Sequence, residues 1–357
     1  MQQPLRFGWY IPTHGDGTHR GNRIEPGMDL FLRVARAAEN AGCDFALVPV
    51  VSTCYEAWVT TAMISAQTER LKMLVAARPG IVQPSHMARM ISTFDQNSGG
   101  RVYVNLIAGG GAAEMAEDGV FLDHDERYAL MDESVTLMKL LWKAEGRISF
   151  RGRHVRVENA HCYPKPLQDP HPPFYIGGIS PAAVDVGAKH ASCYLYWGNT
   201  PAQIAKDIDV VKDAAATYGR RDTIRHGMRL QVCVRETEDE ARKVAFSLIE
   251  GASEAQRLGR AAGLGAESHA DGRMRKFAEE AADNNWWIAP HLWAGLTTIR
   301  HGAGVMMVGN PQQVAETIQR FIDLGCTEFC ISGYPHAEEA EYFGRLVMPY
   351  FRDRLER

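Results

Sequence analysis

The chain has 357 residues, 45% of them hydrophobic, and this length is compatible either with two domains or with one elaborated α/β barrel. The net charge is −4 and the Lys and Arg residues are scattered, which argues against a surface for nucleic acid or anionic membranes. No basic and apolar leader precedes the first strand-like run, and no apolar run is long enough to cross a bilayer, so we expect a soluble cytoplasmic protein. The seven cysteines lack Cys-x-x-Cys spacing, which predicts reduced core thiols.

Strand-like and helix-like segments alternate along the first part of the chain. The predicted strands lie at 6–12, 45–51, 71–77 and 102–108, and the predicted helices at 28–41, 57–66, 84–95 and about 124–143. Gly42 stands where a C-terminal glycine cap is expected, and Asp123 with Glu126 forms a capping-box pattern before the long helix. This regular order indicates β/α units.

Two stretches interrupt the alternation. Residues 146–166 read as a small inserted hairpin, with strands at 148–150 and 154–157. Residues 251–276 are rich in Gly, Ala and charged residues, with few large apolar side chains, which predicts a mobile lid. Between and after these stretches we expect strands at 174–178, 193–197, 229–234, 305–308 and 328–332. We expect helices from 180–181, at 202–218, at 238–249, from 311, and over about 338–354.

About eight units result, and their strands are continuous apolar runs, as expected of strands covered on both faces. The pattern favours a (β/α)8 TIM barrel with insertions, formed by one domain over residues 1–357. Neither G-x-G-x-x-G nor a Walker loop occurs in a suitable context, which argues against a dinucleotide-binding sheet.

Active sites of such barrels form at the carboxyl ends of the strands. The polar and aromatic candidates at or just beyond these ends are His14, Asp16, Cys54, Asn105, Trp197, Arg229, Gln231, Arg300, Tyr334 and His336. Two arginines and a histidine suit an anionic substrate or a phosphate, because guanidinium groups donate to such oxygens in a planar fork. The residues alone therefore predict a barrel enzyme with an anionic ligand.

Simpler explanations exist for several of these residues. Cys54 has the character of an inert core thiol, and Tyr334 before Pro335 suits an extended turn position. His14, Asp16 and His19 lack further ligands nearby in the sequence, so we expect no metal site.

Five motifs carry a resemblance to a known family. They are Pro12-Thr-His-Gly-Asp-Gly17, Asp95-x-x-Ser98-x-Gly100-Arg101, Gly119-Val-Phe-Leu-Asp-His124, His291-Leu-Trp-Ala-Gly295 and Ser332-Gly-Tyr-Pro-His336. With them, nearly the whole chain resembles the FMNH2-dependent alkanesulfonate monooxygenases of the bacterial-luciferase-like flavin monooxygenase family. The second motif marks only the broad superfamily, whereas the first and last motifs with Arg300 are more specific to the sulfonate branch.

The resemblance implies a two-component reaction. A separate NAD(P)H-dependent FMN reductase would supply reduced FMN, and this chain would combine it with O2 and a small anionic organosulfur substrate. The expected products are an aldehyde and sulfite, from cleavage of a C–S bond. The resemblance also implies a homodimer or homotetramer.

The same resemblance assigns roles to the candidates. Arg229 and Arg300 would bind the sulfonate, beside Trp197 and Gln231, and His14 is a further active-site position. Cys54 and Tyr334 would hydrogen-bond the oxygenated flavin or nearby water, under a closed lid. Flavin contacts are expected from Asn105, Ser180, Trp197, Tyr334 and His336, where the helix that begins after Ser180 could hold the FMN phosphate.

Three departures from the family pattern concern the pocket. Gln231 stands where the family has His, Ala108 replaces a Thr, and Gly110-Gly111-Ala112 replaces polar residues. The pocket is therefore expected to be roomier and less polar, and a base role at position 231 is lost. Three alternatives stay open: the same flavin chemistry on another organosulfur or unrelated small substrate, a non-catalytic flavin-binding barrel, and a deazaflavin-dependent dehydrogenase.

Overall fold

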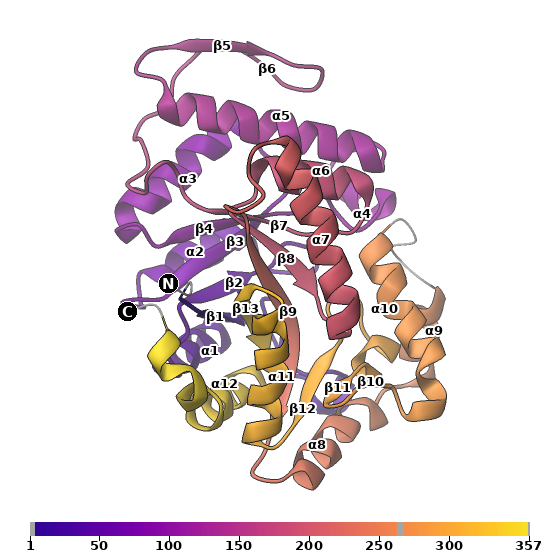
Figure 1. Cartoon of the computed structure of the whole chain (residues 1–357). Helices are drawn as coiled ribbons and strands as arrows, with labels where there is room; N and C mark the ends of the chain where they lie inside the picture. The colour runs from indigo at the N-terminus through magenta and orange to yellow at the C-terminus, as the bar shows by residue number, and fades with distance from the viewer. Residues whose placement is uncertain (1–3, 263–267, 356–357) are drawn as a thin grey trace.

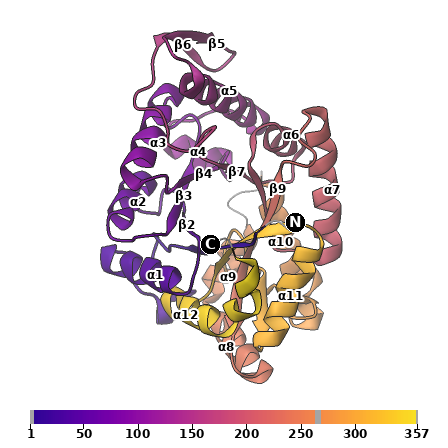
Figure 2. The ribbon, with the colours of Figure 1, turned by 60° about the vertical axis from the view of Figure 1, so that its left-hand side comes forward.

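The computed structural model describes residues 4–262 and 268–355, and their main feature is a closed ring of eight parallel strands (Figures 1 and 2). The ring runs β9, β13, β1, β2, β3, β4, β7, β8 and back to β9. Its strands are β1 (Arg6–Tyr10), β2 (Phe45–Val48), β3 (Lys72–Ala77), β4 (Val102–Leu106), β7 (Phe174–Ile176), β8 (Cys193–Trp197), β9 (Arg225–Val234) and β13 (Cys326–Ser332). The predicted (β/α)8 TIM barrel is confirmed.

Helices surround this ring (Figure 2). They are α1 (Met28–Asn40), α2 (Ala57–Ser65), α3 (Pro84–Ser98), α5 (His124–Lys143), α6 (Pro181–His190), α7 (Pro201–Thr217), α11 (Pro311–Asp323) and α12 (His336–Leu346). Outward-facing residues of the strands form the core with them: the ring of Phe7 lies 5.4 Å from that of Phe329 and 5.7 Å from that of Phe343. Alternate residues of each strand therefore point into the barrel.

The amino end of the barrel interior is filled by a buried ionic cluster. Glu328 is fully buried, its Oε1 lies 2.6 Å from Arg225 Nε and 3.4 Å from an Arg6 amino group, and its other oxygen accepts from the Tyr175 hydroxyl. Above it, Tyr175 stacks on Tyr103 with ring centroids 5.6 Å apart. Because side chains pack this lower part, ligands must enter from the carboxyl ends of the strands.

The superfamily motif around Asp95 is structural. Its carboxylate accepts hydrogen bonds from the backbone N–H groups of Leu167 and Gln168, at 2.6 and 3.0 Å. Arg101 donates to the carbonyls of Ser98 and Ser65, both at 2.9 Å. The motif therefore ties the end of α3 to β4 and to the chain before β7, and it lies away from the mouth of the barrel.

The predicted hairpin consists of β5 (Ile148–Arg151) and β6 (Arg156–Ala160), so its second strand begins two residues later than expected. It lies outside α5 (Figure 1). Glu133 of α5 accepts from the backbone N–H groups of Arg153, His154 and Val155 at 2.7 to 2.9 Å.

The largest insertion lies between β9 and α11. It contains α8 (Glu238–Glu250), α9 (Glu254–Ala262), α10 (His269–Glu280), β10 (Trp287–Ala289), β11 (Leu292–Trp293) and β12 (Met306–Gly309), with short 3-10 turns at Ala282–Asn284 and Gly295–Thr298. The segment expected to be a lid thus forms α9 and much of α10, and its residues 263–267 lie outside the described residues.

Several element predictions differ from the structure. β12 is not a strand of the ring: it pairs with Gln231–Val234 of β9, beyond the segment Arg225–Arg229 that pairs with β8. β9 is accordingly longer than predicted and begins four residues earlier, at Arg225. The short helix α4 (Ala112–Glu117) was not predicted, because glycines precede it and its sequence has little apolar periodicity. Two further 3-10 turns occupy Arg20–Asn22 and Met348–Arg354.

Among the described residues, no helix is both long and apolar enough to traverse a bilayer.

Candidate active site

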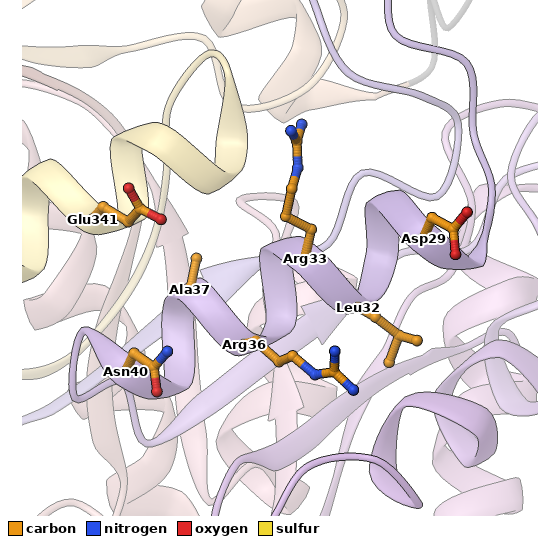
Figure 3. A pocket seen from close by; sticks show the side chains of 7 residues that line it. All are labelled: Asp29, Leu32, Arg33, Arg36, Ala37, Asn40 and Glu341. Carbon is orange, nitrogen blue, oxygen red and sulfur yellow. The ribbon is translucent and has the colours of Figure 1, made fainter.

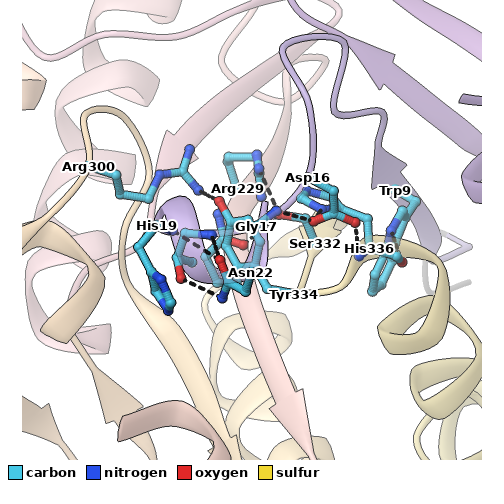
Figure 4. Close-up of polar contacts among 12 residues, drawn as sticks. Trp9, Asp16, Gly17, His19, Asn22, Arg229, Arg300, Ser332, Tyr334 and His336 are labelled. Atoms are coloured by element: carbon cyan, nitrogen blue, oxygen red, sulfur yellow. Dashed lines mark hydrogen bonds and ion pairs between the residues drawn. The ribbon is translucent and has the colours of Figure 1, made fainter. Parts of the chain in front are cut away.

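Arg229 lies at the centre of the candidate site, in the interior of β9 (Figure 4). Its neighbour across the ladder is Trp197, the last residue of β8, so both side chains face the mouth of the barrel. Arg229 is 5% exposed and donates to the Ser332 hydroxyl at 2.9 Å and to the Leu230 carbonyl at 2.8 Å. Its guanidinium carbon lies 4.9 Å from the centre of the Tyr10 ring.

Arg300 approaches the same region from the insertion. It follows the turn Gly295–Thr298 and donates to the hydroxyl of Tyr334, whose ring centre lies 5.7 Å from the guanidinium carbon. Within the parts of the chain that the structure describes, neither Arg229 nor Arg300 has a carboxylate within 4.0 Å. Burial lowers the pKa of Arg229, and so does the nearby charge of Arg300. The mouth therefore holds two cations without a carboxylate partner.

Gln231 is fully buried and lies two residues beyond Arg229 along β9. Its amide nitrogen donates to the Ala303 carbonyl at 3.0 Å, and its amide oxygen accepts from Ser332 at 2.6 Å. The side chain is thus bonded to protein groups at both ends. This arrangement gives Gln231 a role in holding other residues in place.

His336 is the first residue of α12 and is 1% exposed. Its Nδ1 lies 2.7 Å from Asp16, its backbone N–H donates to the same carboxylate at 2.7 Å, and its carbonyl accepts from Trp9 at 3.0 Å. The ring contacts those of Tyr334 and Tyr10, with centroids 4.8 and 5.7 Å away. Its Nε2 is buried and has no hydrogen-bond partner among the residues that the structure describes.

His14 and Cys54 border the site from the loops after β1 and β2. Burial, with the charges of Arg300 and His336, lowers the pKa of His14 to about 4, so this imidazole is neutral at physiological pH. Burial raises the pKa of the Cys54 thiol. A neutral imidazole and a protonated thiol can both donate hydrogen bonds.

Tyr10 connects these residues. Burial raises the pKa of its phenol, and the charges that act on it come from Cys54, Arg300, Arg229 and Tyr334. The rings of His14 and His336 lie 6.3 and 5.7 Å from its own. The predicted residues from five separate segments of the chain therefore surround one tyrosine.

Asn105 and Ser180 lie apart from the arginines. Asn105 is an inward-facing, largely buried residue of β4, and Ser180 caps α6 by accepting from the Ala183 N–H at 3.2 Å. Neither has a hydrogen bond with Arg229 or Arg300 among the described residues. The structure thus divides the predicted site into an arginine group and the start of α6.

The start of α6 offers backbone N–H donors that suit a phosphate. Before Ser180, a Cβ on Gly177 would lie 2.4 Å from the Leu195 carbonyl, and Gly178 has a φ of +138°. Glycines thus let the backbone approach closely ahead of a helix N-terminus, where N–H groups attract anions. With the unpartnered Nε2 of His336 and the amide of Asn105, these residues fit a flavin mononucleotide.

Sequence reasoning did not assign Tyr10 or Arg78 to the site, and it gave Ser332 no role beyond its place in the last motif. Arg78, just after β3, is 3% exposed and donates to Glu114 of α4 at 2.5 Å and to the Val50 carbonyl at 3.0 Å. It therefore holds α4 against the loop that bears Cys54. The alternation of inward residues in β1, from Gly8 to Tyr10, was the one available signal for Tyr10.

A second hollow, of about 370 Å³, lies outside the barrel against α1 (Figure 3). Its lining consists of Asp29, Leu32, Arg33, Arg36, Ala37, Asn40 and Glu341. Acidic and basic side chains are balanced there, and none of the candidate residues takes part. We therefore place the candidate site at the barrel mouth.

The fold is a (β/α)8 barrel, and two arginines, Arg229 and Arg300, lie close to each other at its candidate site. Residues 5–328 match the family described as luciferase-like monooxygenase, and the chain belongs to this family.

Solved structures share the fold over nearly the full length. DmoA from Hyphomicrobium sulfonivorans matches with a TM-score of 0.81 at 19% identity, over 99% of this chain and 90% of that chain. Long-chain alkane monooxygenase (LadA) matches with a TM-score of 0.79 at 18% identity, over 100% and 93%. Riboflavin lyase (RcaE), solved with modified FMN and riboflavin, matches with a TM-score of 0.79 at 19% identity, over 99% and 92%. At such identities the likeness shows a common fold.

The fold also occurs with another cofactor. An F420-dependent secondary alcohol dehydrogenase in complex with an F420–acetone adduct matches with a TM-score of 0.69 at 19% identity, over 97% of this chain and 99% of that chain.

Proposed function

We propose that the protein is a reduced-FMN-dependent monooxygenase that cleaves the C–S bond of an alkanesulfonate and releases an aldehyde and sulfite. The observation that carries the proposal is the pair Arg229 and Arg300, which meet at the barrel mouth without a carboxylate partner among the described residues. A bound sulfonate would offer these two guanidinium groups an anionic partner with oxygens suited to their fork of donors. Trp197 would supply an apolar wall beside it.

The other residues divide the remaining tasks. Cys54, Tyr334 and neutral His14 would donate hydrogen bonds to oxygen atoms or water near the reacting centre. Asn105, Ser180, Trp197, Tyr334 and His336 would hold the flavin. When bound, reduced FMN supplies the electrons with which O2 is activated. Helices α9 and α10 would act as a lid that keeps bulk water away from this reaction.

The reaction needs a second protein. A separate NAD(P)H-dependent FMN reductase would deliver reduced FMN, since the chain shows no dinucleotide-binding motif of its own. We further propose a cytoplasmic homodimer or homotetramer, in which the whole chain acts as one domain.

The runner-up is the same flavin chemistry on an uncharged organosulfur compound or another small molecule. It is favoured by Gln231, a neutral amide whose hydrogen-bonding groups are already used by Ser332 and Ala303, and by Ala108 with the glycines that follow it. The further alternatives are a flavin-binding barrel without turnover and a deazaflavin-dependent dehydrogenase.

Sulfite release tests the proposal. The purified protein would be supplied with a flavin reductase, NADPH, FMN and O2, and assayed with alkanesulfonates from methanesulfonate to decanesulfonate and with dimethyl sulfone. Sulfite release that varies with chain length supports the proposal. Turnover of dimethyl sulfone alone supports the runner-up, and tight binding of reduced FMN without any product supports a non-catalytic barrel. A failure to bind reduced FMN favours the deazaflavin alternative.

A further inference from the structure

Three buried side chains form one continuous chain of hydrogen bonds beneath the mouth of the barrel. Arg229 donates to the Ser332 hydroxyl at 2.9 Å, and Ser332 donates to the Gln231 amide oxygen at 2.6 Å. The Gln231 amide nitrogen then donates to the Ala303 carbonyl at 3.0 Å. Gln231 and Ser332 are fully buried and Arg229 is 5% exposed, so water does not compete for these bonds.

The chemistry of these groups permits only one direction of donation. A backbone carbonyl can only accept, so the Gln231 NH2 group must face Ala303 and its oxygen must face Ser332. The Ser332 hydroxyl has a single proton, which this oxygen takes, and its lone pair therefore faces Arg229. A guanidinium can only donate, so each bond of this hydrogen-bond chain joins one donor to one acceptor.

Arg229 is held on its other sides as well. The Leu230 carbonyl accepts from the second amino group at 2.8 Å, and the Tyr10 ring lies 4.9 Å below the guanidinium carbon. These contacts leave the guanidinium one orientation relative to Trp197, its neighbour across the ladder. The directions in which Arg229 presents its three remaining N–H donors are thereby set by its neighbours.

We propose that Gln231 and Ser332 are positioning residues that orient Arg229 for an anionic substrate, and that their hydrogen-bond chain keeps this orientation unchanged over the neutral pH range. The inference rests on the proposed function, because it assigns the sulfonate to Arg229. The inference also explains a glutamine at position 231. The amide keeps the directions of its hydrogen bonds to Ser332 and Ala303 fixed, because it neither gains nor loses a proton in this pH range.

Other titratable groups also face Arg229. They are Tyr10 from β1, Cys330 from β13, Arg300 from the insertion and Tyr334 from the loop after β13, with His14 and His336 behind Tyr10. Burial raises the pKa of Tyr10 and raises that of Cys330 to about 11, while the pKa of His14 is lowered to about 4. A change in the protonation of the remaining groups affects wild type and a Gln231 variant alike. The ratio of their affinities for the anion therefore reports on the hydrogen-bond chain from Arg229 to Ala303.

The experiment compares Gln231→Glu, Ser332→Ala and the wild-type protein. Binding of methanesulfonate to the full-length protein would be measured by isothermal titration calorimetry from pH 5 to pH 9. We expect Ser332→Ala to bind about tenfold more weakly at every pH, because a buried hydrogen bond to a charged group is lost. Gln231→Glu has nearly the same shape. We expect it to bind about tenfold more weakly at pH 9, where the ionised carboxylate neutralises Arg229, and to approach wild type as it becomes protonated at low pH.

Ser92→Ala is the matched control, because Ser92 is an equally buried serine whose hydroxyl donates to Ala88 within α3. It should leave methanesulfonate binding unchanged. If Ser332→Ala proves unstable, Gln231→Glu still tests the inference. Its pH series compares the affinity of one folded protein at different pH values.

A constant ratio of Gln231→Glu to wild-type affinity across the pH range would overturn the inference, as would wild-type affinity in Ser332→Ala. Both results leave the proposed function standing if wild type binds methanesulfonate. Absence of binding by wild type would instead overturn the inference together with the assignment of a sulfonate to Arg229.

Discussion

Asp16 binds His336 with both carboxylate oxygens. Oδ1 lies 2.7 Å from the imidazole Nδ1, and Oδ2 accepts from the backbone N–H of His336, also at 2.7 Å. The two residues are 320 positions apart, and their contact joins the loop after β1 to the first turn of α12. Because Nδ1 is engaged in this way, only Nε2 of His336 is available for a ligand.

Replacement of Asp16 by Asn should therefore destabilise the fold. The Asn amide keeps one acceptor oxygen but turns an NH2 group toward His336, whose ring and backbone also donate. One buried hydrogen bond is therefore lost, which should lower the free energy of unfolding by about 1 to 3 kcal/mol. Denaturant unfolding at pH 7 measures this change. Asp213→Asn is the control, since Asp213 is largely exposed and pairs with the half-exposed Arg221, and it should change stability little.

The same variant tests a pH effect. Burial alone would raise the pKa of Asp16, but the charge and hydrogen bonds of His336 outweigh it and lower the pKa. The ionised Asp16 carboxylate therefore stabilises the fold above the pKa that it has in the unfolded protein, about 4. This stabilisation is lost as the pH falls further. The stability difference between wild type and Asp16→Asn should shrink below pH 4. A difference that stays constant down to pH 2.5 would contradict this assignment.

Arg300→Ala should reduce kcat/KM for a sulfonate by roughly 100-fold or more, because one of the two cations at the mouth and the partner of Tyr334 disappear together. Arg300→Lys should recover only part of the loss, since an ammonium is a point charge without a planar fork. Steady-state sulfite release measures both. Arg242→Ala, on the exposed side of α8, is the control. A kcat/KM near wild type in Arg300→Ala would refute the site assignment.

Cys54 should behave as a protonated hydrogen-bond donor. Because burial raises the pKa of Cys54, iodoacetamide should alkylate this thiol at pH 8 more slowly than it alkylates glutathione. Mass spectrometry of the native protein during the reaction measures the rate. The six other cysteines are buried, so at a low concentration of iodoacetamide Cys54 should be the main cysteine that is alkylated. Cys54→Ser should keep activity within about threefold, whereas Cys54→Ala should lose more. If Cys54 were alkylated as fast as glutathione at pH 8, the result would indicate an activated thiolate instead.

The barrel itself was predictable because each unit carries a local signal. The strand Cys193–Trp197 is one apolar run bounded by polar residues, and the structure places it at the same residues. The helix after Ser180 and Pro181 begins where the cap was expected. Each of these signals lies within a few neighbouring residues.

The parts that were missed depend on distant contacts. Ser332 and Gln231 are 101 residues apart, and only the register between β9 and β13 brings them together. Tyr10 lies within a strand, and whether it points inward depends on the closure of the ring. The pairing of β12 with the outer half of β9 likewise follows from the insertion, because an apolar run alone does not distinguish a ring strand from an added one.

The insertion contains a buried ion pair that should control access to the site. Arg260 of α9 lies 2.8 Å from Asp271 of α10, with side chains 3% and 7% exposed, and Arg260 also donates to the Thr297 carbonyl at 3.0 Å. Asp271 accepts from the Gly302 N–H at 3.3 Å. The pair thus fastens both helices to the chain on either side of Arg300.

Asp271→Asn should loosen this connection, because the variant leaves Arg260 buried without its counter-charge. We expect amide hydrogen exchange in α10 to accelerate by about 10- to 100-fold. With reductase and FMN supplied, more hydrogen peroxide should form for each sulfite released, since water reaches the flavin more easily. Glu238→Gln removes an exposed pair with Arg242, of equal length at 2.8 Å, and should change neither quantity. Unchanged exchange in Asp271→Asn would refute the anchoring role, whereas faster exchange with an unchanged ratio of peroxide to sulfite would show that α9 and α10 do not shield the flavin.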